Sequence, residues 1–381
     1  MAAKKIETFG EVAHFVDSRA DAIVLACSGG AGRVLISPRL QGRVMTSSCA
    51  GDDGPSLGWV NRGPMQELDN DPKFNNYGGE DRFWLGPEGG PYSLFFSMGA
   101  AQIMESWIVP ECVGQGGFEV RNRGLDRVFL GRHVTATNAR GARFTLDIDR
   151  EIRLLAPAEI EELSGKLPDG VSAVAFKSTN KLTNVGKAPF KPETGLMSIW
   201  ILGMFKPGKR NVVIAPYRAG GKGPALKDDY FGKVPASRLK TKSGCAAFLA
   251  DGQYRAKIGL PPGRATDRLG AINFETNLLT VAQFSLPAKG RYVNSAWGLQ
   301  DDPYCGDVSN SYNDGPEEPG GSSLGGFYEL ESSSPALELA VGKSGIHWHT
   351  TYHFQGSRAQ LAALAKSILG VNIDEVEKLF F

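Results

Sequence analysis

Glycine is the most constraining feature of the sequence, because 48 of the 381 residues are glycine. This share of about 13% exceeds the usual ~7%, and the glycines are spread along the chain, which indicates many turns. Between them lie short segments in which apolar and polar residues alternate, as in RFTLDID at residues 143–149. A period of two is typical of a strand with one wet face, and residues 138–141 (NARG) have the composition of a hairpin turn.

Further segments of this kind predict a sheet protein. The other strand candidates are residues 33–38, 42–48, 92–98, 172–178, 196–205, 211–216, 278–285, 326–331 and 346–354. Ten or more strands with few helical patterns between them favour an all-β sandwich over alternating βαβ units.

Helical periodicity is clear only at the two ends of the chain. Thr8 and Glu11 have the spacing of a capping box, and Ser357 and Gln360 repeat it before an apolar run that ends at Gly370. A second short helix is expected at about residues 374–380.

The organisation of the chain predicts one domain. There is no internal repeat, no long polar linker and no shift in composition. We therefore expect a single β domain over residues 1–381, with an N-terminal helix within 1–20 and C-terminal helices within 357–381.

Charge and composition restrict the expected partners and compartment. A formal net charge of +1 gives no electrostatic reason to expect nucleic acid or an anionic membrane as partner. No stretch approaches the ~18 apolar residues of a spanning helix, and the start MAAKKIETFG lacks the apolar region of a secretory signal. We expect a soluble chain, cytoplasmic as given or periplasmic if a leader has been removed. The five cysteines form no CxxC pair, so we expect free thiols.

Histidines concentrate in one predicted strand. Residues 346–354 read IHWHTTYHF, and in a strand His347, His349, Thr351 and His353 share one face. Imidazoles at i and i+2 can converge on one metal ion or one substrate, and their ordinary pKa suits proton transfer. A polar ladder on a sheet surface is the alternative.

Two glutamates share a face in the same way. Glu329 and Glu331 lie in the predicted strand 326–331. If this strand lies near the histidine strand, Glu329, Glu331, His347 and His349 form one catalytic group that moves protons on a sugar. Alternatively, His347, His349 and Glu329 hold a divalent metal ion, for which Zn, Mn, Ni or Ca are candidates. The spacing does not choose between the two.

Two glycine-rich loops combine amides, carboxylates and aromatic rings. They span residues 75–90 and 297–315. Such side chains give directional bonds to hydroxyl groups, while aromatic faces cover the C–H side of a pyranose. The predicted substrate-binding residues in these loops are Arg82, Trp84, Glu88, Tyr304, Asn310, Tyr312 and Asn313. Turn formation and core packing are the alternative roles.

Three segments carry a resemblance to a known family. GGEDRFWLGPEGG at residues 78–90, STNKLTNVG at 178–186 and YELESSSPA at 328–336, followed by the HWH of the histidine strand, resemble a bacterial family of unknown function. That family is similar to the galactose mutarotase-like (aldose 1-epimerase-like) superfamily. The resemblance covers about residues 30–356.

The resemblance implies a large antiparallel β-supersandwich with a concave face that binds saccharide. It implies that Glu329 or Glu331 is the catalytic glutamate, and it adds Asn180 to the predicted substrate-binding residues. One departure concerns the acid, which epimerases take from a histidine in mid-chain. This sequence has no histidine between His133 and His347.

The predicted function is therefore proton transfer on a mono- or oligosaccharide, of the epimerase, isomerase or lyase type, with or without a metal ion. A non-catalytic saccharide-binding protein is the alternative.

Overall fold

Antiparallel β-sheets make up most of the fold in a computed structural model, which describes residues 6–27, 29–220, 223–242, 244–316 and 321–381. A ten-stranded sheet contains, in spatial order, β11 (Leu239–Lys242), β12 (Cys245–Leu249), β10 (Asn211–Pro216), β14 (Arg268–Asn273), β15 (Leu278–Phe284), β18 (Ser344–Gln355), β8 (Ser172–Asn184), β7 (Arg143–Leu154), β6 (Arg127–Thr137) and β5 (Glu119–Arg123). A five-stranded sheet contains β13 (Ala256–Leu260), β16 (Ser309–Asn313), β17 (Tyr328–Ser333), β9 (Ser198–Phe205) and β4 (Arg82–Gly86). A three-stranded sheet contains β1 (Ile23–Ala26), β2 (Arg33–Ser37) and β3 (Arg43–Ser48).

Helices are short and lie mainly at the ends of the chain. They are α1 (Phe9–Asp17), α2 (Glu111–Gly114), α3 (Pro157–Ser164), α4 (Arg358–Leu369) and α5 (Ile373–Glu377), with 3-10 turns η1 (Pro64–Gln66) and η2 (Met104–Ser106). Both predicted capping boxes are present, at Thr8 before α1 and at Ser357 before α4. Gly370 ends α4 in the left-handed conformation that glycine adopts without strain. The prediction missed α3, whose first helical residue is Pro157.

Side-chain alternation forms the strands where the sequence predicted it. Every second residue of β7 is buried, and β7 pairs with β6 through a hairpin in which Gly141 has φ +78°. One strand prediction is wrong, because residues 92–98 form turns. There the Ser93 hydroxyl accepts hydrogen bonds from the backbone N–H groups of Phe95 and Phe96, which binds the chain to itself instead of to a neighbouring strand.

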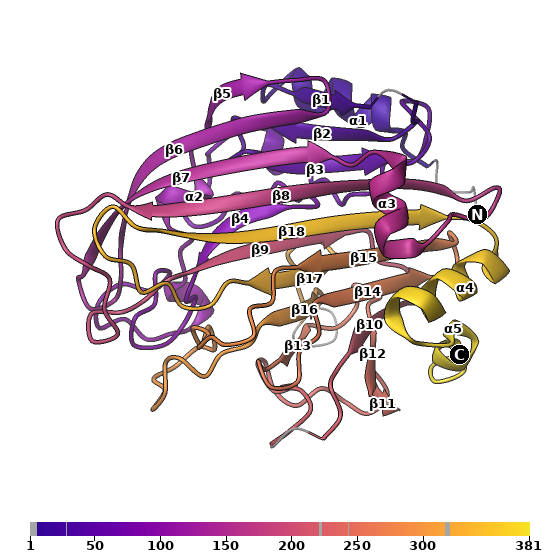
Figure 1. Ribbon diagram of the computed structural model, residues 1–381. Coiled ribbons are helices and arrows are strands. Elements are labelled where there is room, and N and C mark those ends of the chain that lie inside the picture. The colour runs from indigo at the N-terminus through magenta and orange to yellow at the C-terminus, as the bar shows by residue number, and fades with distance from the viewer. Residues whose placement is uncertain (1–5, 28, 221–222, 243, 317–320) are drawn as a thin grey trace.

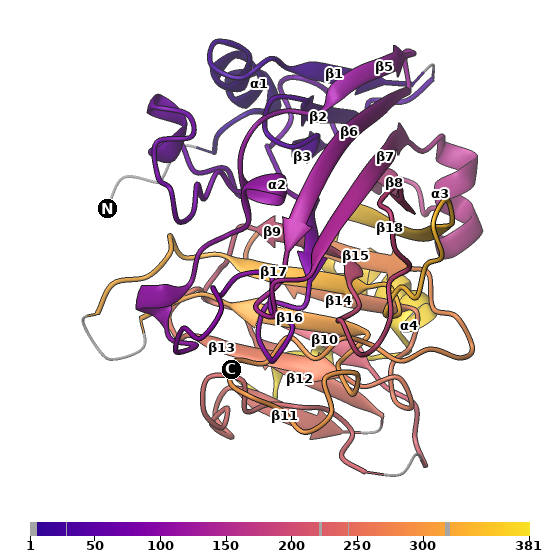
Figure 2. The same cartoon turned by 90° about the vertical axis from the view of Figure 1, so that its left-hand side faces the viewer.

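The ten- and five-stranded sheets pack face to face. Contacts between β15 and β17 and between β18 and β9 join the two layers, and Figures 1 and 2 show β9, β17, β16 and β13 lying behind the larger sheet as it is seen in Figure 1. Helices α3, α4 and α5 cover the outer face of the larger sheet, where they form one apolar cluster with its outward side chains, including Tyr352 and Phe354. The fold is thus all-β and antiparallel, as predicted.

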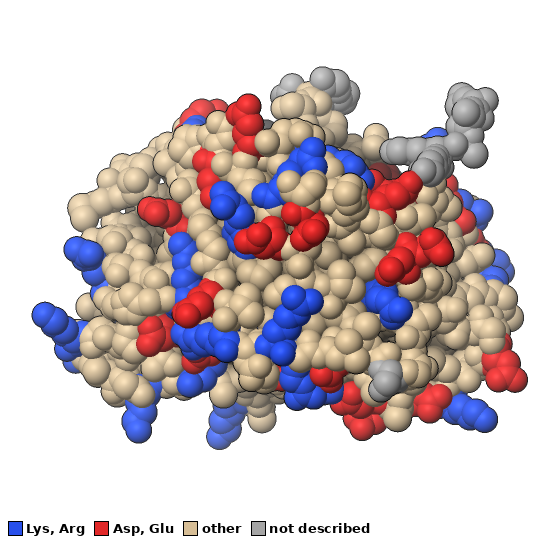
Figure 3. All heavy atoms as spheres, turned by 90° about the horizontal axis from the view of Figure 1, so that it is seen from above, with Lys and Arg blue, Asp and Glu red and all other residues tan. Residues whose placement is uncertain are grey.

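Charged side chains of both signs mix on the surface. Figure 3 shows Lys and Arg interspersed with Asp and Glu on one face of the molecule. No single-sign field that would attract a polyanion covers this face. Among the helices that the structure describes, none has the length and apolarity needed to cross a bilayer.

Candidate active site

A cavity lies on the face of the five-stranded sheet that points away from the ten-stranded sheet. The strand register sets its floor, because Arg82 on β4 pairs with Leu202 on β9, Leu202 with Glu331 on β17, and Glu331 with Asn310 on β16. Directly paired residues of an antiparallel sheet point to the same face. Loops close the sides and bring in aromatic rings. The cavity has two parts. The larger part, called the outer chamber, is lined by Phe74, Arg82, Trp84, Glu88, Met104, Trp107, Trp200, Leu202, Met204, Phe231, Arg255, Lys257, Trp297, Tyr312, Leu324, Phe327 and Glu329.

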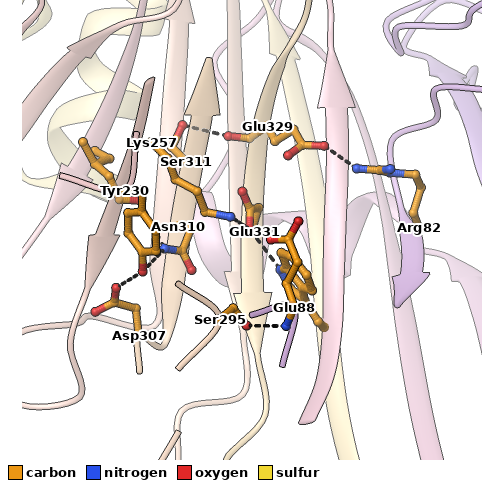
Figure 4. Close-up of polar contacts among 12 residues, drawn as sticks. Arg82, Glu88, Tyr230, Lys257, Ser295, Asp307, Asn310, Ser311, Glu329 and Glu331 are labelled. Carbon is orange, nitrogen blue, oxygen red and sulfur yellow. Dashed lines mark hydrogen bonds and ion pairs between the residues drawn. The ribbon is translucent and has the colours of Figure 1, made fainter. Parts of the chain in front are cut away.

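Two contacts between a cation and a carboxyl group occupy the floor of this cavity (Figure 4). The guanidinium of Arg82 donates to Glu329, and both side chains are almost fully buried. The ammonium of Lys257 donates to Glu331 Oε2 at 2.9 Å. The indole N–H of Trp200 donates to the same oxygen at 3.0 Å. Two carboxyl groups at i and i+2 on one strand thus have different cationic partners.

Burial changes the proton affinity of these groups. Burial raises the pKa of Glu329 to about 8, and the charge of Glu331 adds to this rise, while Arg82 and Lys257 oppose it. For Lys257, burial lowers the pKa, but the carboxylates of Glu331 and Glu88 outweigh it and raise the pKa overall. Glu329 is therefore a carboxyl that holds its proton at neutral pH next to an ion pair of Lys257 with Glu331.

Several polar atoms of the cavity lack a partner among the described residues. These are Nε and one terminal nitrogen (NH1) of Arg82, Oε1 of Glu331, and the indole nitrogen of Trp84. A buried donor or acceptor without a hydrogen bond costs about 1–3 kcal/mol. A ligand that carries several hydroxyl groups can supply these missing bonds.

A smaller inner chamber adjoins the outer one and shares with it Glu88, Trp200, Phe231, Lys257 and Trp297. Its own lining consists of Tyr230, Val293, Ser295, Asp307, Asn310 and Ser333. The Tyr230 hydroxyl donates to Asp307 and accepts from Asn310 Nδ2 at 3.1 Å (Figure 4).

The predicted site residues divide into two groups. Arg82, Trp84, Glu88, Tyr312 and Glu329 line the outer chamber and Asn310 the inner one, and Glu331 lies on the floor through its bonds to Lys257 and Trp200.

Three predicted substrate-binding residues lie elsewhere. Asn180 is buried between the sheets, where its amide donates to the carbonyl of His347. Tyr304 donates to the carbonyl of Pro192 and belongs to the core, and Asn313 bonds the backbone of residues 252 and 254. In each case the side chain satisfies buried backbone groups, so none of the three lines the described chambers.

The predicted meeting of histidines and glutamates does not occur. The side chains of His347 and His349 share a face as expected, but both contact the Ser332 hydroxyl, His347 through Nε2 and His349 through Nδ1, each at 2.8 Å. Ser332 points to the opposite side of β17 from Glu329 and Glu331 because successive strand residues alternate. The imidazoles therefore lie between the two sheets, whereas the carboxylates face the cavity.

The predicted metal site of His347, His349 and Glu329 is not assembled, since β17 itself separates the imidazoles from the carboxylate. In the described part of the chain, no group of three or more His, Cys, Asp or Glu side chains has an arrangement that could hold a metal ion.

The buried imidazoles predict a loss of stability in acid. Burial lowers the pKa of His347 to about 3 and that of His349 to about 4. The unfolded chain takes up these protons near pH 6.5, whereas the folded protein does not. The free energy of unfolding is thus expected to fall as pH drops from about 6.5 to about 4, by about 1.4 kcal/mol per pH unit for each imidazole. Urea titrations at several pH values measure this slope.

The matched variant is the double substitution His347→Gln with His349→Gln. Its stability is expected to vary less between pH 6.5 and pH 5 than that of the native protein. Equal slopes in the two proteins would show that these imidazoles are not the source.

Sequence reasoning missed the central cation, Lys257. It lies on β13 in the segment AKIGL, where a single charged residue interrupts an apolar run. A buried lysine requires a carboxylate partner, so this pattern was the available signal. The aromatic wall formed by Trp107, Trp200, Phe231 and Trp297 was also missed, because it comes from four separate segments.

Solved structures that resemble this chain share only 10–12% sequence identity with it. A candidate aldose 1-epimerase of Escherichia coli K12 superposes with a TM-score of 0.53 at 10% identity, over 88% of this chain and 100% of the other. The Slr1438 protein of Synechocystis sp. PCC 6803 gives 0.51 at 12% identity, over 89% and 97%. A galactose mutarotase-like protein of Lactobacillus casei ATCC 334 gives 0.47 at 12% identity, over 87% and 99%. The predicted galactose mutarotase-like fold is confirmed.

Sequence comparison assigns the family. No curated protein matches this sequence. A family model described as a family of unknown function, DUF6786, matches residues 7–380. The chain belongs to this family of unknown function, whose member described here has the fold of the aldose 1-epimerase-like proteins.

Proposed function

We propose that the protein interconverts the anomers of a monosaccharide by acid–base catalysis in the cavity over the five-stranded sheet. The observation that carries this proposal is the pair Glu329 and Glu331. One is a buried carboxyl whose pKa is raised to about 8, and the other is held by Lys257 at 2.9 Å. Two neighbouring carboxyl groups in such different environments are a recurring acid–base arrangement.

The aromatic wall supports a saccharide as substrate. The rings of Trp84 and Trp200 lie edge to face at 5.7 Å, and those of Phe231 and Trp297 at 6.2 Å. Flat apolar surfaces of this kind cover the C–H faces of a sugar ring, while the few buried polar atoms fix its hydroxyl groups. The Escherichia coli neighbour, a candidate aldose 1-epimerase, agrees with this assignment.

The two glutamates have distinct roles in this mechanism. Glu331 Oε1, the oxygen without a partner among the described residues, accepts the proton of the anomeric hydroxyl. Glu329 donates its proton to the ring oxygen. The C1–O5 bond breaks as the C1–O1 double bond forms, and rotation about C1–C2 presents the other face of the aldehyde. Ring closure reverses both proton transfers.

The cations stabilise the charges that these transfers create. Arg82 contacts Glu329 and stabilises the carboxylate that remains after proton donation. Lys257 donates to Glu331 Oε2, which leaves Oε1 to accept the proton of the substrate. Glu329, with Lys257 nearby, takes the role of the mid-chain histidine that epimerases use as acid and that this sequence lacks.

Magnetisation-exchange NMR tests this proposal directly. The protein is mixed with single aldoses, and exchange between the α and β anomeric protons is compared with the spontaneous rate. Faster exchange with at least one aldose is expected. Binding without faster exchange would favour the non-catalytic saccharide-binding alternative, and appearance of an unsaturated product in the same spectra would indicate a lyase.

The pKa of Glu329 predicts the pH dependence of the reaction. Since the protonated carboxyl is the active form, kcat/KM is expected to be highest below pH 8 and to fall about tenfold per pH unit well above it. The rates are measured at constant ionic strength, after subtraction of the spontaneous rate at each pH. A rate that keeps rising from pH 7 to pH 9.5 would exclude Glu329 as the acid.

A further inference from the structure

The inner chamber adjoins the outer one, Lys257 lines both, and polar side chains are grouped on part of the inner lining. Tyr230 and Asp307 face each other across a hydrogen bond, and Asn310 bonds the same tyrosine hydroxyl. Asp307 lies over Gly259 of β13, where a Cβ atom would come within 2.1 Å of Asp307 Oδ2. The absence of a side chain at Gly259 is what lets this carboxyl approach the floor of the sheet.

Size limits what the inner chamber can hold. Its volume is about 20 Å³, against about 70 Å³ for the outer chamber. One water molecule needs roughly 10–15 Å³ of such space. The inner chamber thus has room for one or two atoms of water size, and the outer chamber has room for several more.

The charges of the lining also limit what the inner chamber can bind. Glu88 and Asp307 both line the inner chamber, and its only cation among the described lining residues, Lys257, is paired with Glu331. A phosphate or carboxylate group would therefore meet two carboxyl groups, while the one cation of the described lining is already paired and Lys227 lies outside it, over the ring of Tyr230. A neutral hydroxyl can instead donate to Asp307 and accept from Lys257, because both amide hydrogens of Asn310 are taken by Tyr230 and the carbonyl of Ile258.

We propose that the inner chamber binds the exocyclic hydroxymethyl group of a neutral hexose whose ring lies in the outer chamber, with Tyr230, Asp307 and Asn310 as specificity-determining residues. This inference rests on the proposed function for the ring-binding chamber. The substrate class is then an unmodified aldohexose. The corresponding pentoses, the 6-phosphates and the uronic acids are discriminated against.

Matched sugar pairs test this inference. Calorimetric affinities are measured for D-glucose with D-xylose, D-galactose with L-arabinose, and D-mannose with D-lyxose, in which the second sugar lacks only the hydroxymethyl group. For the best pair, the hexose is expected to bind at least about tenfold more tightly than the pentose. Glucose 6-phosphate and glucuronate are expected to bind more weakly than glucose.

A chamber-filling variant provides the control. Ser333 ends β17 and lines the inner chamber, and valine is compatible with a strand position. Ser333→Val is expected to lower the hexose-to-pentose affinity ratio to about one, and Tyr230→Phe, which removes only a hydroxyl, is expected to lower it partly. Thermal unfolding checks that both variants fold.

The outcomes separate the two proposals. Equal affinity for hexose and pentose in every pair, or tighter binding of the 6-phosphate or the uronate, would overturn the hydroxymethyl subsite even if anomers are interconverted. A hexose preference that Ser333→Val abolishes, without faster anomer exchange, would support the subsite and contradict the catalytic proposal. Lack of binding by all six sugars would overturn both.

Discussion

Replacing Glu329 with glutamine is expected to lower the rate of anomer interconversion by at least about 100-fold, because general acid catalysis contributes roughly 10²–10⁴. Glutamine has nearly the same shape, and its amide can still donate a hydrogen bond, but it has no carboxyl proton to transfer. Since the carboxyl is almost fully buried with a raised pKa, the neutral amide also avoids the cost of a buried charge. Sugar affinity is therefore expected to change much less than the rate.

The matched control is Glu338→Gln, since Glu338 is an exposed glutamate outside both chambers. Its rate is expected to equal that of the native protein. Thermal unfolding of both variants excludes a folding defect. If Glu329→Gln retains more than about a third of the native rate, Glu329 is not the acid.

Replacing Arg150 with methionine is expected to reduce the free energy of unfolding by about 3–5 kcal/mol, the usual cost of leaving a buried charge without its partner. Arg150 and Asp81 form an ion pair with both side chains fully buried between the sheets. The guanidinium also donates to the carbonyl of Gly42 at 3.0 Å and to Asn180. In the variant, Asp81 keeps only the hydroxyl of Ser178, at 2.7 Å, among its described side-chain partners.

The control for Arg150 is an exposed pair in the same sheet. Arg121 on β5 contacts Asp149, and the two side chains are 46% and 34% exposed. Arg121→Met is expected to cost less than about 1 kcal/mol. Urea denaturation of both variants at neutral pH measures the difference. A similar loss in the free energy of unfolding for the two substitutions would show that the buried pair of Arg150 and Asp81 does not stabilise the fold more than an exposed pair does.

Local pattern predicted much of this fold. The predicted strand segments located β7, β8, β9, β10, β15, β17 and β18, although not the other strands of the two large sheets. The period of two also placed His347, His349, Thr351 and His353 on one face of β18, where all four are buried. Capping spacings located α1 and α4. These features depend on residues that are close in the sequence, so one amino-acid sequence is enough to predict them.

The sequence pattern could not predict which faces of neighbouring strands pack against each other. Glu329 and Glu331 share a face, and so do His347 and His349, but the sequence does not say which face of β17 meets β18. Ser332, on the reverse side, makes that contact. The same reason explains Asn180, which the family resemblance placed at the sugar and the structure places beside Arg150. Long-range contacts such as Lys257 with Glu331 leave no periodic signal.

A crystal structure of the Glu329→Gln variant with its preferred aldohexose tests the central claim most directly, since the variant binds sugar without turning it over. We expect the ring to lie against Trp200 and Trp297, the anomeric oxygen to lie within hydrogen-bond distance of Glu331, and the hydroxymethyl group to lie beside Asp307. A sugar bound outside these chambers, or bound with its anomeric carbon remote from both glutamates, would contradict it.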